Sequence, residues 1–179
     1  MPRTRRDGSC MNEPTFVDTN ILAYARDSDQ GRKQKTAAHC LSVLWQERTG
    51  RTSVQVLSEY YVTLTRKLKP GIRAEEAWDD VQALMSWDPQ PIDVEVLERA
   101  REIERRYRTS WWDATIVAAA HSQSCAVLLT EDFRDGMAFG RLTVRNPFAS
   151  RVEERGDPYQ TPMVPRPRHR TRGRPARSA

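Results

Sequence analysis

Apolar residues in the middle of the chain recur at intervals of three and four positions, a pattern that predicts amphipathic helices. The clearest example runs from Val54 to Leu68 and stops at the Pro70-Gly71 breaker. The same periodicity predicts further helices over residues 34–48, 73–86, 94–107 and 112–123.

Short, largely apolar segments lie between the predicted helices and are typical of buried strands. They cover residues 15–17, 126–129 and 142–144, and a further short strand is expected through Ile92. Strands that alternate with helices predict an α/β domain with a mainly parallel sheet. In such a sheet, functional sites form at the carboxyl ends of the strands.

The two ends of the chain are polar. Residues 1–13 are interpreted as a polar leader and residues 151–179 as a tail rich in proline and arginine, and both are expected to be disordered. Residues 14–150 then form the folded domain. No apolar run approaches the ~20 residues that span a membrane. Three widely spaced cysteines favour a reducing, cytoplasmic setting over a disulfide framework.

The net charge of +5 is unevenly distributed. Residues 158–179 contribute +6 and residues 1–13 contribute +1, which leaves −2 on residues 14–157. A slightly acidic core is not a typical nucleic-acid-binding face. If this core acts on a polyanion, a bound cation is needed to offset its carboxylates. The basic tail is either a contact for nucleic-acid phosphates or a solvated segment without a role.

Four acidic residues carry most of the functional information, and three of them lie where a strand or loop gives way to a helix or turn. They are Asp18, directly after the 15–17 strand; Glu59, on the helix that starts at Val54; Asp113, at the start of the 112–123 helix; and Asp132, shortly after the strand ending at Leu129. Asp18 and Asp132 should leave the same edge of a parallel sheet. Carboxylates gathered there suit a hard divalent cation.

Each acid also has a purely structural interpretation. Asp18 could cap a helix, Glu59 could be solvated, Asp113 fits a capping box with Ser110, and Asp132 could start a turn. Their joint placement favours a metal site, because several carboxylates at one sheet edge repel each other unless a cation neutralises them.

Four segments resemble the acidic motifs of the PIN-domain ribonucleases, and in particular the VapC-like toxins of type II toxin–antitoxin pairs. They are residues 17–24 (VDTNILAY), 56–61 (VLSEYY), 110–120 (SWWDATIVAAA) and 128–133 (LLTEDF). The likeness runs from about Thr15 to Phe148 in the right order. It implies a Rossmann-like sheet of about five parallel strands and Mg²⁺ or Mn²⁺ in an acidic pocket.

The resulting hypothesis is a metal-dependent endoribonuclease that hydrolyses RNA phosphodiester bonds. Its predicted catalytic and metal-binding residues are Asp18, Glu59, Asp113 and Asp132. The candidates for residues that orient these ligands, through hydrogen bonds and without binding the metal, are Asn20, Thr130 and Glu131. The sequence leaves open whether Glu131 or Asp132 contacts metal directly, and whether one or two ions bind.

The resemblance also implies a small antitoxin protein as partner, and a homodimer. Aromatic residues that look exposed are expected to contribute to such contacts, namely Trp45, Tyr60, Trp78 and Trp87. The alternative is a non-catalytic module that uses the same fold to bind RNA or protein. The presence of acids at all four positions weighs against it. A DNA or flap nuclease ranks lower, because the chain lacks long insertions for threading a DNA end.

Overall fold

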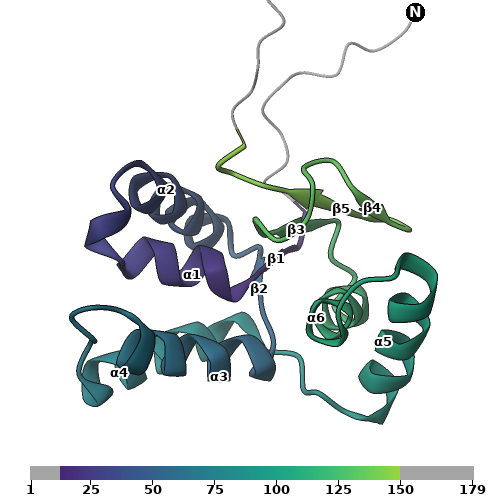
Figure 1. The fold of residues 1–179 in the computed structure, drawn as a ribbon, viewed down its shortest axis with the longest axis horizontal. Coiled ribbons are helices and arrows are strands. Elements are labelled where there is room, and N and C mark those ends of the chain that lie inside the picture. The colour runs from purple at the N-terminus through teal and green to yellow at the C-terminus, as the bar shows by residue number, and fades with distance from the viewer. Residues whose placement is uncertain (1–12, 150–179) are drawn as a thin grey trace, which may run out of the picture. The chain divides into compact units, whose positions relative to one another are not determined.

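A five-stranded sheet lies at the centre of the computed structural model, which describes residues 13–149 (Figure 1). The strands follow the order β2-β1-β3-β5-β4, and only β4 runs antiparallel to its neighbour. Their bounds are β1 Thr15–Val17, β2 Gly50–Arg51, β3 Val127–Leu129, β4 Ala138–Phe139 and β5 Leu142–Arg145. This architecture confirms the predicted α/β fold with a mainly parallel sheet.

The two polar ends of the chain are largely outside this description. Of the predicted leader only Glu13 is described, and the whole predicted tail lies outside the described residues. Their predicted disorder therefore stays a prediction. In the part of the chain that is described, no helix is long and apolar enough to cross a membrane.

The helices pack in neighbouring pairs around the sheet, α1 with α2, α3 with α4 and α5 with α6 (Figure 1). Their bounds are α1 Thr19–Arg26, α2 Arg32–Glu47, α3 Val54–Val62, α4 Ala74–Leu84, α5 Val94–Tyr107 and α6 Trp111–Ser122. Short 3₁₀ turns occupy Ser28–Gln30 and Met85–Trp87, and a π-helical turn occupies Thr63–Lys67. Each predicted helix is present, although α3 changes to the π-helical turn before its predicted end.

One predicted strand is wrong, and two observed strands were not predicted. The expected strand through Ile92 is absent from residues 13–149, and only an isolated bridge pairs Ser53 with Gln90. Strands β2 and β4 were not predicted as strands. Each is two residues long, too short to show an alternating pattern. Strand β4 is held by hairpin pairing with β5, in which Phe139 faces Leu142.

The aromatic residues expected at the surface divide into two groups. Trp45 and Trp78 are 40% and 47% exposed, as expected, and Trp112 is 64% exposed. The prediction is wrong for Tyr60 and Trp87, which are buried. Trp87 packs against Trp45 in a tilted arrangement with ring centroids 4.9 Å apart. The Tyr60 hydroxyl lies 3.3 Å from Asp80 Oδ2 on α4.

The register of the sheet sets the position of the site. Val17 is aligned with Leu129 in the parallel pair of β1 and β3, and the Asp18 N–H donates to the Leu129 carbonyl at 3.0 Å. Asp18 and Thr130 therefore leave the sheet side by side. The predicted meeting of the two chain segments at one sheet edge is thus confirmed.

Gly50, on the strand β2 that pairs with β1, provides a test of the packing against Trp87. A Cβ atom at this position would lie 2.5 Å from a ring carbon of Trp87, which is buried and cannot move aside cheaply. We expect Gly50→Ala to lower the free energy of unfolding by about 1–3 kcal/mol, the usual cost of overpacking. Urea unfolding measures this loss. In a Trp87→Leu background the additional loss from Gly50→Ala should shrink, and an equal loss in both backgrounds would contradict the packing explanation.

Candidate active site

Asp18 lies at the junction of β1 and α1, with its carboxylate almost fully buried. The backbone N–H of Thr19 donates to Oδ1 at 2.6 Å, and the Thr130 hydroxyl donates to Oδ2 at 2.7 Å. Burial raises the pKa of Asp18 to about 7, the nearby charges of Asp132 and Glu59 add to the rise, and the Thr130 hydrogen bond opposes it. Asp18 thus caps α1 and also belongs to an acidic cluster.

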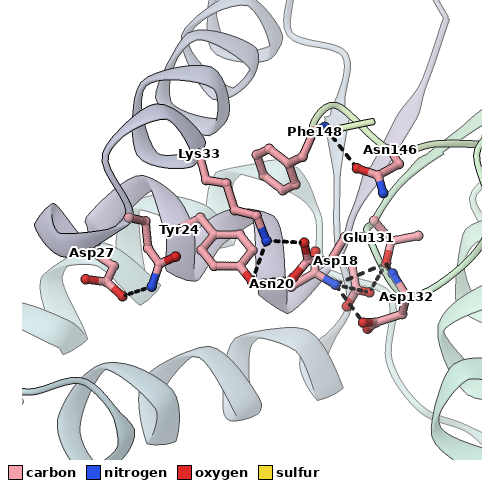
Figure 2. A network of polar contacts seen from close by, with 11 residues as sticks. Asp18, Asn20, Tyr24, Asp27, Lys33, Glu131, Asp132, Asn146 and Phe148 are labelled. Carbon is pink, nitrogen blue, oxygen red and sulfur yellow. Dashed lines mark hydrogen bonds and ion pairs between the residues drawn. The ribbon is translucent and has the colours of Figure 1, made fainter. Parts of the chain in front are cut away.

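Asn20 connects Asp18 with Asp132 (Figure 2). Its amide nitrogen lies 3.2 Å from Asp18 Oδ2, 3.0 Å from Asp132 Oδ2 and 3.1 Å from the Thr130 hydroxyl. Its amide oxygen is buried and accepts no hydrogen bond within the described residues. One side chain therefore holds two carboxylates at the sheet edge and leaves a free oxygen beside them.

Asp132 follows β3 in a turn that Thr130 organises. The Asp132 N–H donates to the Thr130 hydroxyl at 3.1 Å. Partial burial raises the pKa of the Asp132 carboxyl, the Asn20 hydrogen bond opposes the rise, and the charges of other acids raise it further. Those acids are Asp113, Glu131 and Glu59. Asp132 is therefore a predicted site residue whose carboxyl feels the charges of other acids.

Glu59 reaches the site from the middle of α3 and is half-buried. Gln55 donates to Oε1 at 3.0 Å, and the Thr19 hydroxyl donates to Oε2 at 3.2 Å. The simple interpretation of Glu59 as a solvated surface acid does not describe this environment. Two donors hold its carboxylate toward the start of α1, where Asp18 lies.

Asp113 occupies the first turn of α6, as the sequence predicted for a capping box. Its N–H donates to the Ser110 hydroxyl at 3.1 Å, and its carboxylate accepts from the Thr109 hydroxyl at 3.4 Å. Its charge contributes to the raised pKa of Asp132. Asp113 is nevertheless held more loosely than Asp18.

A cavity of about 310 Å³ collects three of the four predicted acids, Asp18, Glu59 and Asp132. Asp113 and Glu131 are not part of its lining. Lys67 lines this cavity together with Glu59, and the same two residues also line a neighbouring apolar groove of about 760 Å³. Within residues 13–149, no group of three or more His, Cys, Asp or Glu side chains is arranged to hold a metal ion as it stands.

A match to a protein-family model identifies the family of the chain that forms this cavity. The family model for the PIN domain matches residues 15–139, which include β1, β3 and all four predicted acids. The chain belongs to the PIN domain family.

Solved structures similar to this PIN domain include a toxin–antitoxin complex from Klebsiella pneumoniae, at 20% identity and a TM-score of 0.55. The match covers 75% of this chain and 98% of that one. VapBC2 from Rickettsia felis, bound to a DNA fragment from its promoter, matches at 17% identity and a TM-score of 0.51, covering 74% and 97%. Both show the same fold.

A third structure, the sarcin–ricin loop cleaving toxin VapC20 from Mycobacterium tuberculosis, is 25% identical with a TM-score of 0.48. That match covers 64% of this chain and 86% of the other. No curated protein matches the chain.

The side chains of this PIN domain fit a hard divalent cation. The cavity offers carboxylate oxygens from three residues, and the buried amide oxygen of Asn20 has no hydrogen-bond donor among residues 13–149. Oxygen atoms are the ligands that Mg²⁺ and Mn²⁺ accept. A cation among them would offset the mutual repulsion of the three carboxylates, of which Asp18 is buried, Glu59 half-buried and Asp132 exposed.

Several residues of the site were not identified from the sequence. Thr19 and Gln55 hold Glu59, and Lys33 and Tyr24 hold Glu131. Gln55 lies one helical turn before Glu59, a spacing that could have indicated the contact. Lys33 has no such signal, because 98 positions separate it from its partner.

The raised pKa of Asp18 predicts how stability depends on pH in the metal-free PIN domain. A carboxyl group whose pKa rises from 3.8 to about 7 on folding stabilises the fold at low pH, and this contribution is lost as pH rises toward 7. We expect wild type to lose stability relative to Asp18→Asn over that range. Urea unfolding of both proteins in chelator gives the difference. A difference that does not change with pH would contradict the burial of an acid with this pKa.

Proposed function

We propose that this PIN domain is a metal-dependent endoribonuclease, and that it acts as the toxin of a toxin–antitoxin pair. The observation that supports the catalytic part is the convergence of Asp18, Glu59 and Asp132 on one oxygen-lined cavity at the sheet edge. These residues come from three different elements, and each is held by donors from its neighbours. Such preorganised acids are expected of a metal-dependent hydrolase rather than of a passive binding surface.

Mg²⁺ or Mn²⁺ is the proposed cofactor. A divalent cation supplies Lewis-acid chemistry, which polarises a phosphodiester and makes a water molecule a stronger nucleophile at neutral pH. Asp18, Glu59 and Asp132 are the proposed ligands that line the cavity, and Asp113 is the proposed fourth. Among residues 13–149 the Asp113 carboxylate accepts a long hydrogen bond from Thr109, and it can therefore turn toward Asp132 with little cost.

The other residues of the site have supporting roles in this proposal. Thr130 and Asn20 hold the carboxylates of Asp18 and Asp132 in place, so that little reorganisation is needed when a cation binds. Lys67 supplies a positive charge at the boundary of the acidic cavity and the apolar groove. There it can bind an RNA phosphate that the carboxylates would otherwise repel.

The toxin assignment draws on the two structures of the same fold that belong to toxin–antitoxin assemblies. We propose a small antitoxin protein as partner and a homodimer as the assembled form of this chain. Large apolar side chains are exposed and available for such contacts, notably Trp45, Trp78 and Trp112. Burying side chains of this size is a common source of association energy.

Substitution of the acids tests the catalytic proposal. We expect Asp18→Asn and Asp113→Asn each to lower the rate of RNA cleavage by about 100-fold or more, because loss of a ligand should exceed the cost of losing a residue that only orients one. Cleavage of a labelled RNA pool in Mg²⁺ measures the rates, and far-UV circular dichroism checks the fold. Asp79→Asn is the matched control, since Asp79 is an exposed acid on α4 away from the cavity.

Chelation completes this experiment. Full removal of divalent cations should abolish cleavage by wild type, and added Mg²⁺ should restore it. Undiminished cleavage in chelator would refute the metal-dependent mechanism. Wild-type activity in Asp113→Asn alone would instead show that Asp113 is only a helix cap.

The partner proposal predicts a measurable change in toxicity and assembly. Expression of the chain alone should arrest growth of a bacterial host, because an unmasked ribonuclease degrades host RNA. Expression together with the protein encoded beside it should relieve the arrest, and the two should co-purify. Light scattering of the purified chain at micromolar concentration should give the mass of a dimer. A monomer with no toxicity and no co-purifying protein would contradict the toxin assignment but not the nuclease activity.

A further inference from the structure

Glu131 and Asp132 are adjacent in sequence but their carboxylates point to different partners (Figure 2). Asp132 accepts from Asn20 and lines the acidic cavity. Glu131 turns away from the cavity toward α2, where Lys33 Nζ lies 2.6 Å from its Oε2. The hydroxyl of Tyr24 donates to the other oxygen of Glu131. Both oxygens of Glu131 are therefore occupied by donors: Tyr24, which itself lines the cavity, and Lys33, which does not.

The ammonium group of Lys33, which pairs with Glu131, also contacts two aromatic rings. Lys33 Nζ lies 4.5 Å from the ring centroid of Tyr24 and 5.2 Å from that of Phe148. The two rings meet edge to face with centroids 5.2 Å apart. Phe148 is placed in turn by a 2.9 Å hydrogen bond from its N–H to the Asn146 side chain. Segments from α1, α2 and the stretch after β5 thus meet at one lysine.

An isolated ion pair with this exposure would contribute little, since the Lys33 and Glu131 side chains are 39% and 23% exposed. The two cation–π contacts and the tyrosine hydrogen bond make it part of a network, which costs more to break than a single pair. Without Lys33, Glu131 would keep one hydrogen bond and have a flexible side chain next to an oxygen-lined cavity. A cation in that cavity would attract it.

We propose that Lys33 is a positioning residue that keeps the Glu131 carboxylate out of the acidic cavity, so that Asp132 alone supplies the ligand from this turn. The proposal rests on the proposed function, because it concerns which acid a bound cation meets. Tyr24 assists by occupying the second oxygen of Glu131, and Phe148 holds the lysine in place. The network thereby determines which of two adjacent acids is available as a metal ligand, which the sequence leaves open.

The test is a double-mutant cycle of Lys33→Met and Glu131→Gln, read by Mn²⁺ affinity and by RNA cleavage. In Lys33→Met the released Glu131 adds a carboxylate to the cavity, so Mn²⁺ should bind more tightly in calorimetry. The same change distorts the ligand set, so kcat should fall about tenfold, as for loss of a residue that orients metal ligands, while KM changes little. Affinity and turnover therefore move in opposite directions, which a loss of stability would not produce.

The second arm of the cycle identifies Glu131 as the cause. In a Glu131→Gln background, Lys33→Met should leave both Mn²⁺ affinity and kcat nearly unchanged, because no carboxylate is released. Lys33→Arg should retain wild-type behaviour. Lys35→Met is the matched control, since Lys35 is an exposed lysine on the same helix and its loss removes the same charge.

Metal-free crystal structures of wild type and Lys33→Met separate this proposal from the nuclease assignment. We expect the Glu131 side chain to face Tyr24 in wild type and to face the cavity beside Asn20 in the variant. A Glu131 that stays beside Tyr24 in the variant, or equal effects of Lys33→Met in both backgrounds, overturns the role of Lys33. Absence of Mn²⁺ binding and cleavage in wild type refutes the proposed function, while the two structures still decide where Lys33 directs Glu131.

Discussion

The hydrogen bond from Thr130 to Asp18 joins the sheet to the site, and most of the acidic cavity depends on it. It exists because β1 and β3 pair in parallel and end in register, so that Asp18 and Thr130 emerge together. The Thr130 hydroxyl also accepts from the Asp132 N–H, which turns Asp132 back toward Asp18. A single buried side chain thus gathers two carboxylates that 114 positions separate in sequence.

This arrangement carries an electrostatic cost that is removed by protonation at low pH or by a bound cation. Burial and neighbouring negative charge raise the pKa of Asp18 to about 7 and also raise that of Asp132. The fold supplies hydrogen-bond donors that reduce the repulsion between the carboxylates but do not cancel it. Proteins commonly accept such a cost at functional sites, where the strain is relieved by the species that the site binds. Here the species proposed is a divalent cation.

The polar side chains around the cavity have different roles. Asn20 and Thr130 hold the acids, Lys67 brings positive charge to the boundary with the apolar groove, and Lys33 retains Glu131 on the outer side. Each of these polar side chains comes from a different element or loop. The cavity is therefore sensitive to packing between elements as well as to the loss of its acids.

The sequence by itself determined the helices with clear periodicity, the mainly parallel sheet and the sheet edge where Asp18 and Asp132 meet, because these follow from local patterns and from strand polarity. It did not determine strands β2 and β4, the burial of Tyr60 and Trp87, or the direction in which Glu131 points. Those features depend on contacts between distant segments, and adjacent residues such as Glu131 and Asp132 carry the same charge and nearly the same side chain. Only the tertiary structure, by placing Lys33 and Tyr24 beside one of them and Asn20 beside the other, gave the two acids different environments.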